Sequence, residues 1–215
     1  MLEYNEYIKN HNTPAKQLVV MLHGYGSNKD DLINLAPELS NYVPNALFIS
    51  PGAPFQMEGM MHPQHRQWFS LNDRSKDALL REMKTVEKII ADFISEKLNE
   101  HHLTDDDLCL LGFSQGTMLS LYLALEEIVK PKIILGYSGR TIHNEWKCGK
   151  EEKKTKMMLI HGQEDDIITT KEMEITDKIL QTYGFKTKTH ISRYLAHGID
   201  IDGINLGGDF LRNNF

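Results

Sequence analysis

The chain has few cysteines and no excess of basic residues, and both shortages narrow the class of protein. Its two cysteines, Cys109 and Cys148, do not make a disulfide framework. Reduced thiols in a cytoplasmic protein are the simple expectation. Lys and Arg number 24 against 30 Asp and Glu, which gives a formal net charge of -6. We therefore expect no nucleic-acid partner and no anionic-membrane surface, since both call for a basic patch.

Long apolar runs are also missing from the sequence. No run approaches the roughly 20 residues that span a bilayer, so we expect no integral membrane segment. The first residues show neither a basic flank nor an apolar stretch, so we expect no secretory signal. The composition, 40% hydrophobic and 25% charged, is that of a globular protein. A length of 215 residues predicts a single domain over residues 1–215.

Apolar strand patterns alternate with helical patterns along the chain. The clearest helix is expected over residues 75–100, where apolar residues recur every three or four positions. Continuous apolar strands separated by helices favour a mostly parallel sheet covered on both faces, which is an α/β fold. Such sheets bind ligands at the carboxyl ends of their strands. We predict strands over 17–22, 46–50, 108–111, 132–137, 156–161 and 188–192, further helices over 27–42 (kinked or split at Pro37), 115–129, 170–183 and 202–213, and an irregular segment over 51–74.

One short motif carries the strongest chemical signal. An apolar run ends in Gly112-Phe113-Ser114-Gln115-Gly116, and a helical pattern begins at once. A Gly-x-Ser-x-Gly pattern between a strand and a helix is typical of a nucleophile elbow. The turn leaves almost no room for a Cβ two residues before and two after the serine. Ser114 is therefore the candidate nucleophile; the alternative is a glycine-rich loop that leads into an ordinary helix.

A nucleophilic serine needs a base, and the base needs a carboxylate to orient it. In sheets with such an elbow the chain order is Ser, acid, His. The predicted strand over 156–161 runs into a loop with three carboxylates, Glu164, Asp165 and Asp166. We favour Asp165 as the acid, although any of the three is also compatible with a solvated loop position.

The chain has ten histidines, but only two of them follow Asp165. His190 lies inside a predicted strand. His197 follows that strand between Ala196 and Gly198, in a loop of the kind that brings a ring over the elbow. We therefore favour His197 as the base, and the alternative is a surface loop histidine.

Two backbone amides are candidates for an oxyanion hole. One is the amide of Gln115, which directly follows the nucleophile. The other is expected in the loop after an early strand, and the strand over 17–22 runs into His23-Gly24-Tyr25-Gly26. Because the glycines let this backbone approach a ligand closely, we predict Tyr25 as the second donor. The plain alternative is a strand-to-helix turn.

Six short blocks of the sequence together resemble a known family. They are Leu22-His23-Gly24-Tyr25-Gly26, Pro51-Gly52-Ala53-Pro54, Trp68-Phe69, Gly112-Phe113-Ser114-Gln115-Gly116, His161-Gly162-Gln163-Glu164-Asp165 and Ala196-His197-Gly198-Ile199. In this order, over roughly residues 17–205, they resemble the phospholipase/carboxylesterase family of small α/β-hydrolases, which includes the acyl-protein thioesterases. The resemblance implies an α/β-hydrolase fold without a large cap domain, hydrolysis of carboxylic esters or thioesters, and no cofactor. It also supports Ser114, Asp165 and His197 as a triad, with the amides of Tyr25 and Gln115 as the oxyanion hole.

The sequence departs from the family pattern at two positions. Thr117 stands where the family has a second glycine after the elbow, which bears on how closely the helix packs. Ser70 stands where the family has Asp after Trp-Phe, which puts substrate preference in doubt.

The irregular segment is a candidate for binding substrate. It contains Met57, Met60, Met61, Trp68 and Phe69. Methionine adapts to varied apolar partners, and in the resembling family this region borders the acyl pocket. We expect these side chains to line a groove for an acyl group. The alternative is that they only cover the edge of the sheet.

We predict a cytoplasmic serine hydrolase that cleaves small acyl esters or thioesters through an acyl-enzyme, as a carboxylesterase, lysophospholipase or acyl-protein thioesterase does. We expect no metal site, because His62, His65 and the pair His101-His102 lack a Cys or carboxylate at suitable spacing. The main alternative is a binding protein of the same fold that has lost catalysis. A peptidase ranks lower, since no charged specificity pocket is indicated. Acyl length and a homodimer stay open.

Overall fold

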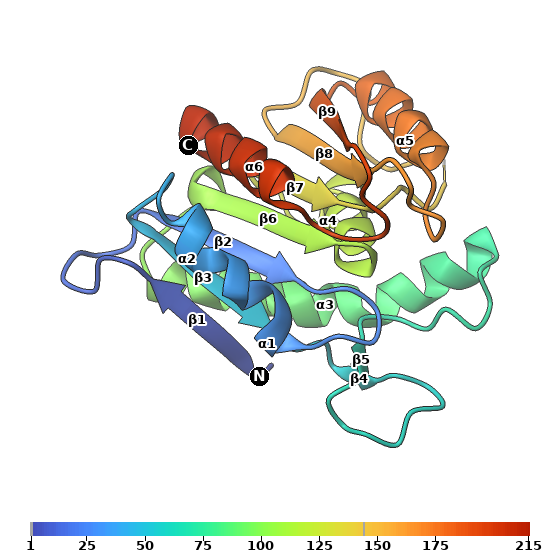
Figure 1. The fold of residues 1–215 in the computed structure, drawn as a ribbon, viewed down its shortest axis with the longest axis horizontal. Helices are drawn as coiled ribbons and strands as arrows, with labels where there is room; N and C mark the ends of the chain where they lie inside the picture. Colours follow the sequence, from blue (N-terminus) through green and yellow to red (C-terminus); the bar gives the residue numbers. More distant parts are fainter. Residues whose placement is uncertain (1, 144) are drawn as a thin grey trace.

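The computed structural model describes residues 2–143 and 145–215 and contains a seven-stranded, mostly parallel sheet (Figure 1). The strand order is β1-β3-β2-β6-β7-β8-β9. The edge strand β1 pairs antiparallel with β3, and all other neighbours are parallel. The strands are β1 (Tyr4–Ile8), β2 (Gln17–Leu22), β3 (Ala46–Pro51), β6 (Leu108–Phe113), β7 (Ile133–Tyr137), β8 (Lys156–Gly162) and β9 (Lys186–Ser192), with a separate hairpin of β4 (Phe55–Gln56) and β5 (Arg66–Gln67).

Helices cover both faces of the sheet because its buried strands send alternate side chains into two hydrophobic cores. In β6, Leu108 and Leu110 belong to one core, and Cys109 and Leu111 to the other. The first core is closed by α3 (Lys76–Glu100), α4 (Gln115–Leu125) and α5 (Thr170–Thr182), and the second by α1 (Lys29–Leu32), η1 (Ile33–Leu35), α2 (Ala36–Leu39) and α6 (Ile201–Asn214) (Figure 1). The described residues form an α/β-hydrolase arrangement without a large cap, as predicted.

The predicted helices and strands are present in the structure, but several of their boundaries differ from the prediction. The expected helix over 27–42 is three short pieces, and Pro37 lies in the first turn of α2, where its missing amide proton costs nothing. Helix α4 stops at Leu125 rather than 129, because Glu127 adopts a left-handed conformation with φ 58°. Strand β1 and the β4–β5 hairpin were not predicted, since each is short and only half-buried. A 3-10 turn, η2 (Asp105–Asp107), precedes β6.

His23, the residue directly after β2, is completely buried beside the indole of Trp68, with ring centroids 5.1 Å apart. Its Nε2 accepts a hydrogen bond of 3.1 Å from the Ala53 amide, and its Nδ1 donates one of 2.8 Å to the Gly24 carbonyl. The ring is therefore neutral, with its proton on Nδ1. Burial lowers the pKa of His23 from 6.5 to about 4.

Acidification should therefore cost stability at His23. The unfolded chain takes up a proton there below its ordinary pKa of 6.5, whereas the folded chain does so only near pH 4, so the free energy of unfolding falls as the pH falls through this range. Between pH 7 and pH 5 the expected loss is about 2 kcal/mol, measured by urea unfolding. The His23→Gln variant, which can keep an acceptor for the Ala53 amide, should lack this part of the loss, whereas a His11→Gln control at an exposed position should retain it. An unchanged loss in His23→Gln would contradict the assignment.

Candidate active site

Ser114 lies in a tight turn between β6 and α4, with φ 52° and ψ −111°. A positive φ is rare for a residue with a side chain and marks a strained position. Glycine is required on both sides. A Cβ at Gly116 would overlap the carbonyl oxygen of Leu22 on β2, and one at Gly112 would overlap the amide of Thr117. This is the backbone geometry expected of a nucleophile elbow.

Two further glycines make room for Thr117, the residue that departs from the family pattern. Cβ atoms at Gly136 and Gly139 would both collide with the Thr117 side chain. Its hydroxyl donates a hydrogen bond of 2.9 Å to the carbonyl of Tyr137 at the end of β7. The extra bulk is thus accommodated between α4 and β7, where the Ser114 amide donates to the same Tyr137 carbonyl at 2.9 Å.

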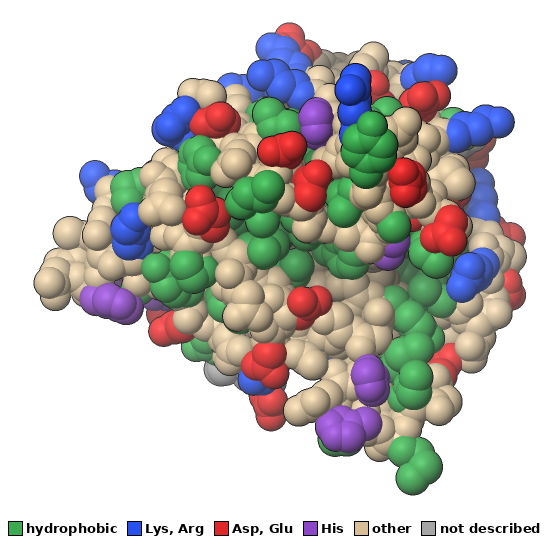
Figure 2. All heavy atoms as spheres, viewed as in Figure 1, with side chains coloured by type: hydrophobic (Ala, Val, Ile, Leu, Met, Phe, Trp, Pro, Cys, Tyr) green, Lys and Arg blue, Asp and Glu red, His purple; other side chains and the backbone are tan. Residues whose placement is uncertain are grey.

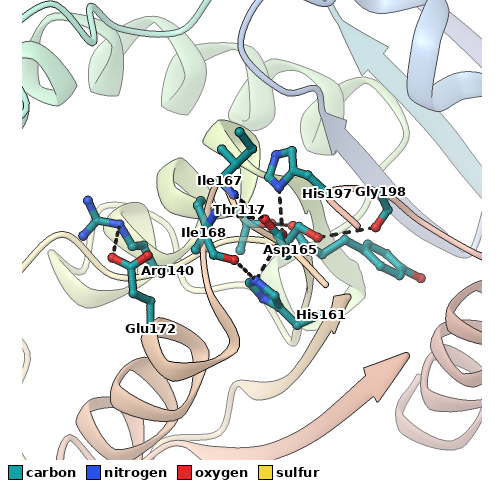
Figure 3. Close-up of polar contacts among 11 residues, drawn as sticks. Thr117, Arg140, His161, Asp165, Ile167, Ile168, Glu172, His197 and Gly198 are labelled. Atoms are coloured by element: carbon teal, nitrogen blue, oxygen red, sulfur yellow. Dashed lines mark hydrogen bonds and ion pairs between the residues drawn. The ribbon is translucent and has the colours of Figure 1, made fainter. Parts of the chain in front are cut away.

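Asp165 and His197 meet although they lie in loops after different strands, β8 and β9 (Figure 3). Asp165 Oδ2 is 2.8 Å from His197 Nδ1, and the Asp165 carboxylate has no exposed surface. The Glu164 amide donates a hydrogen bond of 2.8 Å to the carbonyl of Leu195, which ties the two loops together. Asp166 and Glu164, the alternatives for the acid, are both exposed.

The Asp165 carboxylate is held by more groups than the sequence indicated. Its Oδ1 accepts hydrogen bonds of 3.0 and 2.9 Å from the amides of Ile167 and Ile168. Buried His161 lies behind it, with Nε2 3.2 Å from Asp165 Oδ2 and 2.5 Å from the Ile168 carbonyl (Figure 3). Since both neighbours are acceptors, Nε2 of His161 carries the proton. This contact could not be predicted from the position of His161 in β8. It forms because the turn after β8 folds back and places the Asp165 carboxylate beside the His161 ring.

Opposing effects act on the protonation of Asp165. Burial alone would raise the pKa of this carboxyl, but hydrogen bonds from the Ile168 amide, His197 and the Ile167 amide outweigh it and lower the pKa below its ordinary value. The carboxylate is therefore ionised near neutral pH. It fixes the His197 ring so that Nε2 is the atom left free for chemistry.

Ser114 and His197 lie close in the fold without being hydrogen bonded to each other. The ring of His197 packs on Phe113, the residue before Ser114, with centroids 4.9 Å apart. The Ser138 hydroxyl, at the end of β7, donates a hydrogen bond of 3.4 Å to the Gly198 carbonyl and so holds the same loop. In residues 2–143 and 145–215 the Ser114 hydroxyl makes no hydrogen bond, so the structure brings together Asp165 and His197 but does not link Ser114 to them.

The loop after β2 lies against the elbow. A Cβ at Gly24 would be 3.6 Å from Ser114 Cβ. Gly26 has φ 80°, and its amide donates a hydrogen bond of 2.8 Å to the Arg66 carbonyl, which fixes the turn around Tyr25. Gln115 is the first residue of α4, where helix geometry leaves the amide without a partner inside the helix. Among the described residues, neither the Tyr25 amide nor the Gln115 amide donates a hydrogen bond.

The Gln115 side chain makes structural hydrogen bonds that were not predicted from the sequence, in addition to the role proposed for its amide. Its Oε1 accepts a hydrogen bond of 2.9 Å from the Trp68 amide, and its Nε2 donates one of 2.8 Å to the Phe69 carbonyl. The Trp68 indole in turn donates to the carbonyl of His23 at 2.9 Å. Gln115 thus fastens the segment after β3 to the elbow.

This placement corrects one expectation for the substrate-binding segment. Trp68 and Phe69 have no exposed surface and pack in the core, so they support the segment instead of lining a groove. Met57 is half-buried, with its sulfur 3.1 Å from where a Cβ of Gly26 would lie. Met61 is 97% exposed and Met60 46%. The three methionines are therefore free to contact a substrate, and their role stays a prediction.

Ser70, which stands where the family has Asp, lies near two carboxylates. The Ser70 hydroxyl donates a hydrogen bond of 3.1 Å to Glu58, and its amide lies 3.3 Å from a Glu82 oxygen. Two carboxylates thus remain at this part of the loop.

Across the described ranges, no helix combines the length and the apolar character needed to cross a bilayer. Nor do His, Cys, Asp and Glu side chains form any group of three arranged to hold a metal ion in the described part of the chain.

Comparison with known proteins identifies a family for the chain. The sequence profile described as phospholipase/carboxylesterase matches residues 3–214. The chain is 25% identical to an esterase of Escherichia coli, YpfH, over 93% of this chain and 83% of the relative. It is 24% identical to acyl-protein thioesterase 1 homolog 1 of Dictyostelium discoideum, over 96% and 94%.

Solved structures are also similar to this chain. The crystal structure of esterase PE8 matches with a TM-score of 0.86 at 30% identity, and covers 100% of this chain and 99% of that one. The carboxylesterase of Bacillus cereus, at 15% identity and a TM-score of 0.82 over 100% of this chain and 95% of that one, shares the fold. With a family match over nearly its whole length and a solved esterase structure of the same fold at 30% identity, the chain belongs to the phospholipase/carboxylesterase family of hydrolases.

Proposed function

We propose that this protein is a serine hydrolase that cleaves carboxylic esters or thioesters through Ser114, His197 and Asp165. The observation that carries the proposal is the 2.8 Å contact between the buried Asp165 carboxylate and the partly exposed His197, near a strained serine. An isolated serine hydroxyl is a poor nucleophile near neutral pH, and a base oriented by a carboxylate is what activates it. The names of the relatives, an esterase and an acyl-protein thioesterase, fit this class.

The proposed reaction has two halves. In the first, Ser114 Oγ attacks the carbonyl carbon while His197 Nε2 takes its proton, and the oxyanion is held by the amides of Tyr25 and Gln115. His197 then returns the proton to the leaving oxygen or sulfur, which departs from the acyl-enzyme. In the second half a water repeats these steps and releases the acid. The open gap between Ser114 and His197 closes in this scheme when substrate is bound, as catalytic hydrogen bonds do in other hydrolases.

Removal of the nucleophile is the first test. Ser114→Ala should lower kcat for p-nitrophenyl acetate by about a millionfold, because the acyl-enzyme cannot form. A fluorophosphonate probe should add one label to the wild type, seen by intact mass, and none to the variant. Ser120→Ala is the matched control: this serine lies on the same helix and only donates to the Gly116 carbonyl at 2.9 Å. Wild-type activity in Ser114→Ala would remove the mechanism.

The acid can be tested separately from the nucleophile. Asp165→Asn should lower kcat by about ten-thousandfold, because an amide in this place favours the wrong tautomer of His197. Asp166→Asn changes the exposed neighbour and should stay within a fewfold of wild type. Equal effects of the two substitutions would argue against Asp165 as the orienting carboxylate.

The methionine segment is proposed to receive the acyl group. Met57 lies beside the loop that carries Tyr25, and Met60 and Met61 are exposed further along the same segment. In the wild type, kcat/KM for p-nitrophenyl esters should rise from acetate to octanoate, since each buried methylene contributes about 0.8 kcal/mol. The Met60→Ser/Met61→Ser double variant should flatten this rise. A variant with the wild-type dependence on acyl length would place the acyl chain elsewhere.

A second candidate function has a specific observation behind it. The Ser114 hydroxyl makes no hydrogen bond within the described residues, and one relative, 26% identical over 87% of this chain and 80% of its own length, is named a probable inactive carboxylesterase of Oryza sativa. A hydrolase-fold binding protein without catalysis would show neither probe labelling nor ester hydrolysis while remaining folded. The same labelling experiment therefore separates the two functions.

A further inference from the structure

A small apolar pocket lies at Phe113, the residue before Ser114, on the face of the sheet opposite α3 and α4. Its volume is about 270 Å³. Hydrophobic side chains gather in a hollow between α6 and the α1–η1–α2 segment on the face drawn in Figure 2. The pocket is lined by Asp31, Leu32, Leu35, Phe113, Gly198 and Ile199.

Residues that line the pocket are next in sequence to both reacting residues of the proposed mechanism, Ser114 and His197. Phe113 directly precedes Ser114 and contacts the ring of His197, with centroids 4.9 Å apart. Gly198 and Ile199 directly follow His197. One wall of the pocket, the Phe113 ring, therefore contacts the imidazole of His197. Met57, by contrast, lies against Gly26 in the loop that carries Tyr25.

We propose that this pocket is the leaving-group subsite and selects a short, uncharged apolar alcohol; the inference rests on the proposed hydrolase function. When the tetrahedral intermediate collapses, the carbon–oxygen bond to the alcohol breaks and the proton on His197 Nε2 passes to that oxygen. The departing group must therefore lie next to the imidazole, and the pocket whose Phe113 wall contacts the imidazole is the one that can hold it. The acyl group then lies on the methionine side.

Size and charge define the class of alcohol. A volume of about 270 Å³ lies below the roughly 300 Å³ at which sites for drug-sized ligands begin, so a chain of a few carbons fits and a long one does not. Leu32, Leu35 and Ile199 offer no polar partner. The one charged side chain, Asp31, accepts a hydrogen bond of 2.6 Å from the Ser27 hydroxyl and disfavours an anionic leaving group.

Isomeric esters distinguish the two sides of the site. Butyl acetate and methyl pentanoate have the same atoms, but the first carries its additional methylenes on the alcohol and the second on the acyl group. In the wild type, kcat/KM for butyl acetate should exceed that for methyl acetate by roughly tenfold, because three more methylenes are buried, each worth up to a factor of about four. Leu35→Trp fills the pocket and should bring this ratio to about one, while the ratio of methyl pentanoate to methyl acetate stays within about twofold of wild type.

Two further variants keep the test decisive. Ile199→Trp narrows the pocket from the opposite wall and should have the same selective effect, so the test survives if Leu35→Trp does not fold. Ile175→Trp, at a half-exposed position on α5, should change neither ratio. Equal loss of both ratios in the pocket variants, or loss of the methyl pentanoate ratio alone, would overturn the assignment. If the wild type hydrolyses none of these esters and takes up no fluorophosphonate, the proposed function itself fails, which is a different result from hydrolysis without preference for the longer alcohol.

Discussion

The close approach of helix α4 to strand β2 is the contact on which the rest of the site depends. At Gly116 the helix backbone comes so near the Leu22 carbonyl that no side chain fits between them. This contact fixes where α4 begins, and with it the strained conformation of Ser114 and the direction of the Gln115 amide. It also brings the loop after β2 against the serine. A larger residue at position 116 would push α4 away from β2 and so move Ser114 away from the loop that carries Tyr25, whereas Gly136 and Gly139 leave room for the Thr117 side chain.

Burial and hydrogen bonding act together on the second half of the site. A carboxylate with no exposed surface is stable only if its oxygens are satisfied, and Asp165 has two amides, His197 and the nearby His161 to do so. The same groups that keep it ionised also prevent it from turning. Because its Oδ1 is fully engaged with the loop amides, Oδ2 is the atom left for the imidazole. The orientation of His197 is thus a consequence of how the loop after β8 folds upon itself.

Much of this arrangement could be predicted from the sequence, and the misses have a common physical cause. The parallel sheet, the elbow and the meeting of Asp165 with His197 follow from chain order and from which residues end each strand. The side-chain role of Gln115, the contact of His161 and the burial of Trp68 and Phe69 depend on segments that are distant in sequence, as in the 2.9 Å bond between residues 68 and 115. No local pattern encodes such pairs. The aromatic residues of the irregular segment therefore led to the prediction of a substrate groove. In the structure Trp68 and Phe69 are buried in the hydrophobic core and hold the segment in place.

The pocket at Phe113 and the methionine segment differ in how rigidly their residues are held. On one side, Leu32, Phe113 and Ile199 come from or directly adjoin helices and strands of the second core, so the space between them is fixed by packing. On the other, Met60 and Met61 extend from a segment attached at Gln115 and at Arg66, whose guanidinium donates to the carbonyls of Ala53 and Pro54 at 2.9 and 2.6 Å. A fixed space discriminates by size, whereas flexible methionines adapt to many apolar shapes. On the proposed assignment, the fixed side should limit the length of the alcohol that is released, whereas the methionine side should accept acyl chains of increasing length.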